Sequence, residues 1–95
     1  MSSSATTSVS ARARAIALAG DATRLRILRL LFACQGACVS DVAGRLRAPV
    51  ANISHHLRAL EDGGLVRSTR KGKTICYALR DSPLIRSLRR VVCVE

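Results

Sequence analysis

Apolar residues recur every three or four positions along most of this chain, a spacing that is typical of amphipathic α-helices. The pattern is regular after Asp21, which can cap a helix, and it is interrupted at Gly36. It resumes after Ser40, a second candidate cap, and after Pro49, which fits the first turn of a helix. Gly63-Gly64 ends that segment, because glycine favours the left-handed conformation that often follows a helix. Helices are therefore predicted to start near Ala11, Asp21, Ser40, Pro49 and Ser82-Pro83.

Between the fourth and fifth predicted helices the pattern changes to the alternation that is typical of β-strands. Leu65 to Arg70 and Thr74 to Leu79 are predicted as two strands, joined as a hairpin by the basic turn Lys71-Gly72-Lys73. In the second strand, alternation places Cys76 on the face opposite Tyr77. The order helix, helix, short helix, helix, hairpin, helix predicts a mainly α (α+β) fold. It is a winged helix-turn-helix, with one two-stranded hairpin as the wing.

Length and composition fit one small domain with an aliphatic core. The chain has 95 residues, of which 48% are hydrophobic and 2% aromatic. It carries 16 Lys and Arg against 6 Asp and Glu, a formal charge of +10. Such an excess favours a polyanionic partner, with nucleic acid ahead of an anionic membrane. No apolar run approaches the ~20 residues that a membrane span needs, so no membrane partner is expected.

The N-terminal segment is rich in serine, threonine and alanine. Residues 1–10 are predicted to be a disordered tail, ahead of a DNA-binding and dimerisation domain over residues 11–95. The apolar stretch from Ile16 to Ala19 is too short for a secretory signal, so we expect a cytoplasmic protein in a reducing compartment. The four cysteines are then expected to be thiols or metal ligands rather than a disulfide framework.

The fourth predicted helix carries an outward face suited to DNA. On a wheel at about 100° per residue, Ile53, Leu57 and Leu60 cluster on one side. The opposite side is short, polar and rich in donors, which suits contact with base edges in a major groove. Adjacent His55 and His56 point apart and cannot share one ion, so His56 is predicted to be packed and hydrogen-bonded. The residues of this helix predicted to meet DNA are Ala51, Asn52, Ser54, His55 and Arg58.

The predicted hairpin is basic around its tip, where Arg67 is joined by three further cations. A wing of this kind meets backbone phosphates or the adjacent minor groove. It supplies affinity rather than sequence reading, and each phosphate contact steepens the salt dependence of binding. The wing residues predicted to contact DNA are Arg70, Lys71 and Lys73.

Four segments carry a likeness to a known family: DATRLRILRLL, CVSDVAGRL, VANISHHLRALEDGGLV and KGKTICYAL. Over residues 21 to 79 the chain resembles the ArsR/SmtB family of bacterial winged-helix repressors, and most nearly its cadmium- and lead-responsive branch. The resemblance implies a cytoplasmic bacterial homodimer, joined through its first and last helices, that occupies operator DNA until an inducer releases it. It places DNA contacts at Ala51, Ser54 and His55. A two-fold dimer predicts a palindromic operator with half-sites about one helical turn apart.

The inducer site departs from the pattern of that branch. The branch has Cys-Val-Cys at the start of the short helix, where this chain has Cys38-Val39-Ser40, and residues 1–11 contain no cysteine. Soft thiolates favour cadmium, lead, zinc or trivalent arsenic, and a regulatory site usually needs three or four donors. Cys34 flanks the same turn as Cys38, and Cys93 can reach across the dimer. The predicted ligands of a thiophilic metal or metalloid ion are therefore Cys34, Cys38 and Cys93.

Two further positions near this pattern are assigned other roles. Cys76 is interpreted as a small core hydrophobe, a common role of free cysteine. Asp81 matches the acid of the family's zinc site on the last helix, but Pro83 stands in place of its first histidine. A zinc site of that type is therefore not expected.

Two alternatives keep DNA binding but change its regulation. One is a thiol-based repressor of the same fold, in which two cysteines respond to oxidants or reactive sulfur. The other is a constitutive architectural DNA-binding protein with structural cysteines and little sequence preference. An enzyme is not expected, because the chain has no carboxylate pair, nucleophile–base arrangement or phosphate-cradling glycine loop. The sequence favours the metal- or metalloid-responsive repressor.

Overall fold

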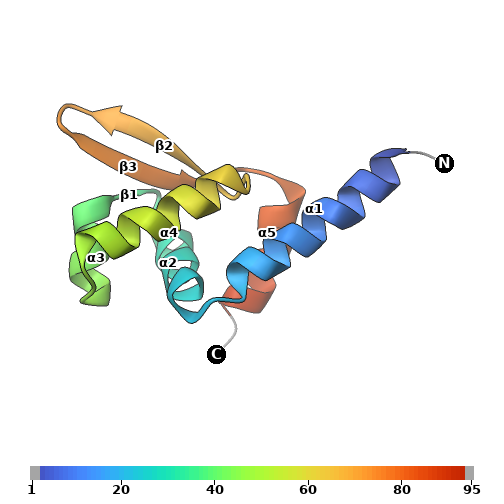
Figure 1. Cartoon of the computed structure of the whole chain (residues 1–95), viewed down its shortest axis with the longest axis horizontal. Helices are drawn as coiled ribbons and strands as arrows, with labels where there is room; N and C mark the ends of the chain where they lie inside the picture. The colour runs from blue at the N-terminus through green and yellow to red at the C-terminus, as the bar shows by residue number, and fades with distance from the viewer. Residues whose placement is uncertain (1–2, 94–95) are drawn as a thin grey trace.

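The helices and strands follow the predicted order. The structure is a computed structural model that describes residues 3–93, and over this range it has five helices and three strands (Figure 1). The helices are α1 (Ser3–Ala19), α2 (Ala22–Ala33), α3 (Val39–Leu46), α4 (Val50–Asp62) and α5 (Pro83–Val92), and the strands are β1 (Ala37–Cys38), β2 (Val66–Lys71) and β3 (Thr74–Leu79). The fold is the predicted winged helix-turn-helix, with α3 and α4 as the helix-turn-helix and β2 and β3 as the wing.

Polar caps begin two of the helices, and a third predicted cap is displaced. The Asp21 carboxylate accepts a hydrogen bond from the Arg24 N–H at 3.0 Å, and this bond lowers the pKa of Asp21. Ser82 caps α5 in the same way. The prediction that Ser40 caps α3 is wrong, because β1 leads directly into the helix and Cys38 occupies the N-cap position.

α1 starts earlier than the predicted position near Ala11. It begins at Ser3, so residues 3–10 of the predicted tail are helical. No glycine or proline interrupts residues 3–19, and nothing in the sequence therefore stops the helix from extending into the serine- and threonine-rich segment. Residues 1–2 lie outside the described range. No helix among residues 3–93 is long and apolar enough to cross a membrane.

An antiparallel sheet of three strands replaces the predicted two-stranded hairpin. β2 and β3 pair along their length, as predicted. β1 adds a strand on the other side of β3, which gives the order β1–β3–β2. In that pairing Ala37 lies opposite Tyr77, and Cys38 lies opposite Cys76. The sequence did not reveal β1, because two residues are too few to show a strand period.

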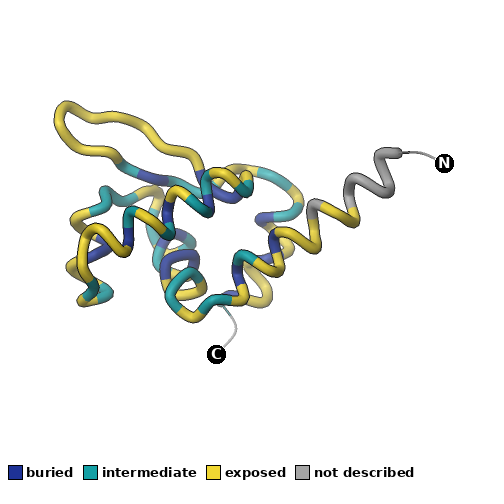
Figure 2. Tube along the Cα trace, viewed as in Figure 1, coloured by how far each residue is buried: buried dark blue, intermediate teal, exposed yellow. Residues whose placement is uncertain are grey.

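The core is mostly aliphatic and gathers where the helices meet the base of the wing. Ile53, Leu57 and Leu60 of α4 are fully buried and form the predicted stripe. Tyr77 contributes an aromatic ring from β3, and burial raises the pKa of its phenol. Figure 2 shows the buried positions in the centre and exposed positions at the wing tip. Other buried residues include Ile27, Leu28, Leu31, Val42, Leu65, Val66, Ile85 and Leu88.

A tight turn joins the two helices of the helix-turn-helix. Arg47 follows α3 in the left-handed conformation, at φ 53° and ψ 49°. Its N–H bonds to the Gly44 carbonyl at 3.3 Å, and the Ala48 N–H bonds to the Ala43 carbonyl at 3.0 Å. Pro49 then occupies the N-cap of α4, directly before the first turn in which it was predicted. The turn directs α4 across α2 and α3 (Figure 1). One face of α4 remains exposed to solvent.

Candidate DNA-binding surface and cysteine pair

α4 presents to solvent the face that was predicted to read DNA. Ile53, Leu57 and Leu60 anchor the opposite side in the core, so the side chains between them point outward. Ser54 is half-buried at the edge of this face. The other predicted contacts are all exposed: Ala51, Asn52, His55 and Arg58. These five residues are called the reading face.

His56 lies behind the reading face and holds α4 against α2. The Arg24 side chain donates a hydrogen bond from Nε to His56 Nδ1 at 3.1 Å. His56 is half-buried, and its ring lies edge-on to that of His55, with the centroids 5.7 Å apart. The prediction of a packed, hydrogen-bonded histidine is confirmed. Because Arg24 lies in the first turn of α2, this bond fixes the orientation of α4 through the start of α2.

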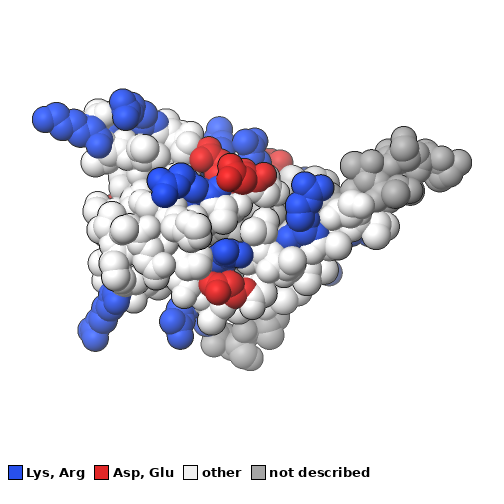
Figure 3. All heavy atoms as spheres, in the orientation of Figure 1, with Lys and Arg blue, Asp and Glu red and all other residues white. Residues whose placement is uncertain are grey.

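The wing is tied to the C-terminal end of α4 at its base. The Glu61 carboxylate accepts hydrogen bonds from the Ser68 N–H at 3.2 Å and from the Ser68 hydroxyl at 2.7 Å. Toward the tip the chain turns through Gly72, whose φ of +63° favours glycine. Figure 3 shows basic side chains gathered at the wing tip. The exposed cations of the wing are Arg67, Arg70, Lys71 and Lys73.

The structure joins two cysteines in a way the sequence did not predict. Cys38 and Cys76 lie opposite each other on β1 and β3 and are linked by a disulfide bond. The expectation that all four cysteines are thiols or metal ligands is therefore corrected. The interpretation of Cys76 as a core residue is also wrong, because Cys76 is half-buried on the sheet face opposite the buried Tyr77.

The other two predicted ligands lie against the core. Cys34 and Cys93 are free, half-buried and packed on the apolar cluster. The Cys34 thiol donates a hydrogen bond to the Leu30 carbonyl at 3.2 Å, one turn back in α2. Cys34, Cys38 and Cys93 are thus not brought together within one chain. Among the residues that the structure describes, no three or more His, Cys, Asp or Glu side chains gather as a metal site.

A polar groove of about 350 Å³ runs along the sheet beside the cysteine pair. It is lined by Cys38 and Cys76 together with Arg67 and Lys71 of β2 and Asp41 of α3. The groove therefore lies between the start of the helix-turn-helix and the wing. Two of its side chains are cations and one is an acid, which makes it positive in balance.

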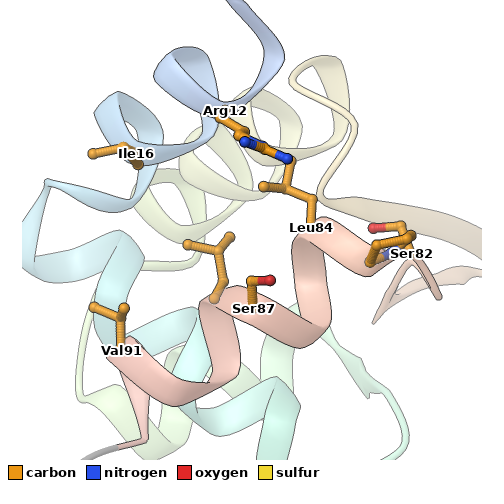
Figure 4. A pocket seen from close by; sticks show the side chains of 8 residues that line it. Arg12, Ile16, Ser82, Leu84, Ser87 and Val91 are labelled. Atoms are coloured by element: carbon orange, nitrogen blue, oxygen red, sulfur yellow. The ribbon is translucent and has the colours of Figure 1, made fainter. Parts of the chain in front are cut away.

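A second groove, apolar and of about 530 Å³, lies between α1 and α5. Figure 4 shows residues that line it, Arg12 and Ile16 from α1 and Leu84, Ser87 and Val91 from α5. Ile16 and Val91 expose 65% and 72% of their surface. Large apolar side chains exposed on adjoining helices are suited to contact with an apolar partner.

Comparison with known proteins decides the family. Residues 21–68 match the family described as "Bacterial regulatory protein, arsR family". The HTH-type transcriptional regulator CmtR of Mycobacterium tuberculosis is 41% identical over 86 residues, which cover 90% of this chain and 71% of CmtR. The chain belongs to the arsR family. It is thus a DNA-binding transcriptional regulator and not an enzyme, as predicted.

Further arsR-family comparisons agree in sequence and fold. A homologue of the cadmium resistance transcriptional regulatory protein CadC from Staphylococcus aureus is 38% identical over 61 residues, covering 64% of this chain and 50% of that protein. The NMR structure of the cadmium metal sensor CMTR from Mycobacterium tuberculosis has a TM-score of 0.68 at 38% identity, covering 86% of this chain and 84% of that one. The homodimeric winged helix-turn-helix domain of Mb0332, a possible ArsR-family regulator from Mycobacterium bovis, has a TM-score of 0.79 at 27% identity. That match covers 98% of this chain and 87% of the Mb0332 domain. The resemblance stated from the sequence is confirmed.

One residue of the cysteine pair, Cys76, was not predicted from the sequence of this arsR-family chain. Strand alternation already placed Cys76 on the face of the strand opposite Tyr77. What was missing was β1, which carries Cys38 alongside it. A two-residue strand leaves no periodic signal, so the pairing emerges only in three dimensions.

Proposed function

We propose that this arsR-family protein is a bacterial cytoplasmic repressor that binds an operator as a homodimer. The observation that carries the proposal is the exposed reading face of α4 beside a basic wing. A helix with short polar side chains fits the major groove, where base edges distinguish all four base pairs. The wing cations then contact flanking phosphates and fix the register of the complex.

The partner copy is proposed to dock on the apolar groove between α1 and α5. Exposure of Ile16 and Val91 in this groove supports the assignment, as does the homodimer named for the Mb0332 domain. A two-fold dimer presents two α4 helices to half-sites about one helical turn apart. Sedimentation of Val91→Asp should show a monomer with weakened operator binding, whereas a stable Val91→Asp dimer would move the interface elsewhere.

The inducer is proposed to be a thiophilic metal or metalloid ion of the cadmium, lead, zinc and arsenic(III) class. Relatives named for cadmium sensing and cadmium resistance support this class, as does a cysteine at the start of α3. One chain supplies no group of three donors among its described residues, so the site needs the second copy. Cys38 is the proposed central ligand, with Cys93 of the opposite protomer and Cys34 as the further candidates.

An operator-release titration tests the inducer. Fluorescence anisotropy follows fully reduced protein on a duplex selected for binding from a random-sequence pool, as cadmium, lead, zinc or arsenite is added. At least one ion should release wild type, and Cys38→Ser should need at least roughly tenfold more of it. If none of the ions releases the protein from the duplex, the proposed inducer class is wrong. Normal release of Cys34→Ser or Cys93→Ser would remove that cysteine from the site.

A further inference from the structure

The bonded cysteines connect two parts of the DNA-binding unit that are distant in sequence. Cys38 ends β1 and is the N-cap residue of α3, whereas Cys76 lies in the wing strand β3, 38 residues later. Both are half-buried and lie outside the apolar cluster. Cys34 and Cys93 instead pack against that cluster. Position thus separates one cysteine pair that is joined across the sheet from two cysteines that pack against the core.

We propose that Cys38 and Cys76 are a reversible redox pair that fastens the wing to the start of α3 and decides whether Cys38 is available to an inducer ion. The first part rests only on the pairing of the two residues in the sheet. The second part rests on the proposed inducer class. Oxidation state then sets when the repressor responds to metal.

The groove around the pair suits thiol chemistry. Arg67 and Lys71 line it together with the two cysteines, and Asp41 is the acid among its lining residues. Positive charge favours the thiolate, which is the form of cysteine that attacks oxidants. The Thr74 hydroxyl lies 3.9 Å from Cys38 Sγ and donates a hydrogen bond to the Lys71 carbonyl at 2.9 Å. The two cysteines thus lie in polar, positively charged surroundings that a small oxidant can reach.

The oxidant class is a hydroperoxide, and the reductant is a dithiol. One thiolate attacks an oxygen of hydrogen peroxide, the O–O bond breaks, and a sulfenic acid and a hydroxide ion result; the hydroxide takes up a proton from solvent to give water. The second thiol attacks that sulfur, the S–S bond forms, and a second water leaves. Two electrons pass from the two sulfurs to the peroxide. A dithiol reverses the step by thiol–disulfide exchange and is itself oxidised to a disulfide.

Formation of the Cys38–Cys76 disulfide changes both the attachment of the wing and the availability of Cys38 as a metal ligand. β1 pairs with β3 through only two residues, Ala37 and Cys38, so the covalent bond is the strongest link between the start of α3 and the wing. A disulfide sulfur is no longer a thiolate and does not serve as a soft-metal ligand. The oxidised protein should therefore keep its operator when cadmium is added, and the reduced protein should release it.

Thiol counting on the full chain tests the pair directly. Reduced wild type has four thiols, and peroxide should leave the two of Cys34 and Cys93 until dithiothreitol restores all four. Peptide mass spectrometry should recover Cys38 joined to Cys76. Cys34→Ser is the matched control and should form the same bond, whereas Cys76→Ser should not. A bond from Cys38 to any other cysteine, or between two chains on a non-reducing gel, overturns the pair.

Cadmium release tests the control of the inducer site. Oxidised wild type should require at least roughly tenfold more cadmium for release than reduced wild type, because its Cys38 thiolate is absent. Dithiothreitol should restore the response. Equal release of both forms, with the bond shown to be present, overturns the control by oxidation. If the reduced protein responds to none of the ions, the inducer proposal is wrong. The thiol-counting result is not affected by that outcome.

Discussion

The reading face and the wing both lie on the proposed DNA-binding surface, but they are held in place very differently. α4 rests on three fully buried side chains and is also fixed by the Arg24–His56 hydrogen bond. The wing is exposed along most of β2, and only its base packs into the core, through Val66 and Tyr77. Its further ties are the Glu61–Ser68 hydrogen bonds at its base and the link from β3 to β1 through Cys38 and Cys76.

This difference assigns different tasks to the two regions. Moving α4 means disturbing the core, which costs a large share of the stability of a small domain. Altering the outer part of the wing, beyond Val66 and Tyr77, disturbs only a few polar contacts and one bond. A regulatory change at the outer wing or the start of α3 therefore costs the domain less stability. The residues proposed to read the DNA sequence are held more firmly, on α4.

Leu57→Ala is expected to give the largest effect, because it removes the anchor of α4. Leu57 is fully buried, so the variant should lose about 3 kcal/mol of unfolding free energy and most operator binding with it. Urea denaturation followed by circular dichroism measures the loss. Val50→Ala truncates an apolar residue on the same helix that is 53% exposed, and it should change stability by less than about 0.5 kcal/mol. Similar losses in both variants would contradict the anchoring role.

His55→Ala combined with Ser54→Ala should weaken operator binding much more than binding to random DNA. Removing a side chain that bonds to a base edge typically costs about 1–3 kcal/mol, so operator affinity should fall at least roughly tenfold. The fold should survive, since His55 is exposed and Ser54 lies at the edge of the reading face. Anisotropy on both duplexes at one salt concentration measures the effect. Equal losses on the two duplexes would remove these residues from base reading.

Lys71→Ala and Lys73→Ala should produce the opposite pattern, because the wing cations are proposed to contact phosphates. Affinity should fall equally on operator and random DNA. The slope of log affinity against log salt should become shallower by about 0.9 for each phosphate that is no longer neutralised. Arg26→Ala, an exposed cation on α2, is the control and should leave the slope nearly unchanged. If the salt dependence of binding is unaltered in the wing variants, the wing does not contact the phosphate backbone of the DNA.

Asp21→Ala should have the smallest effect, a modest fall in the urea midpoint through loss of the α2 cap. Asp21→Asn should keep the cap and the midpoint at neutral pH. The hydrogen bond lowers the pKa of Asp21, so its stabilisation is present above the usual aspartate pKa and lost as the pH falls through the lower folded pKa. Between pH 7 and pH 3 the midpoint should therefore fall further in wild type than in Asp21→Asn. Identical pH dependence in the two would contradict the role of this carboxylate.

The sequence predicted most of the fold, because the fold depends on periodic patterns. The α4 stripe of Ile53, Leu57 and Leu60 showed which side of the helix is buried, and so which side is open to DNA. The glycine at position 72 marked the wing tip, where its φ is positive. The role of His56 also followed, because its place at the edge of the stripe implied packing and a hydrogen-bond partner.

The cysteine site could be predicted only in part, because it depends on contacts between distant segments. Family likeness pointed to Cys38, but it gave no reason to choose Cys76 over Cys34 or Cys93. That choice depends on β1, which is two residues long, and on the register that sets Cys38 opposite Cys76. Neither a strand of that length nor a register across 38 residues leaves a periodic signal in the sequence.

Selection of binding sites from random-sequence duplexes tests the central claim most directly, that α4 of a dimer reads an operator. Wild-type protein should enrich an inverted repeat whose half-sites are centred about one helical turn apart. His55→Ala with Ser54→Ala should fail to enrich it while still binding random DNA. Absence of any enriched sequence from the wild-type selection would contradict the account and favour an architectural DNA-binding protein.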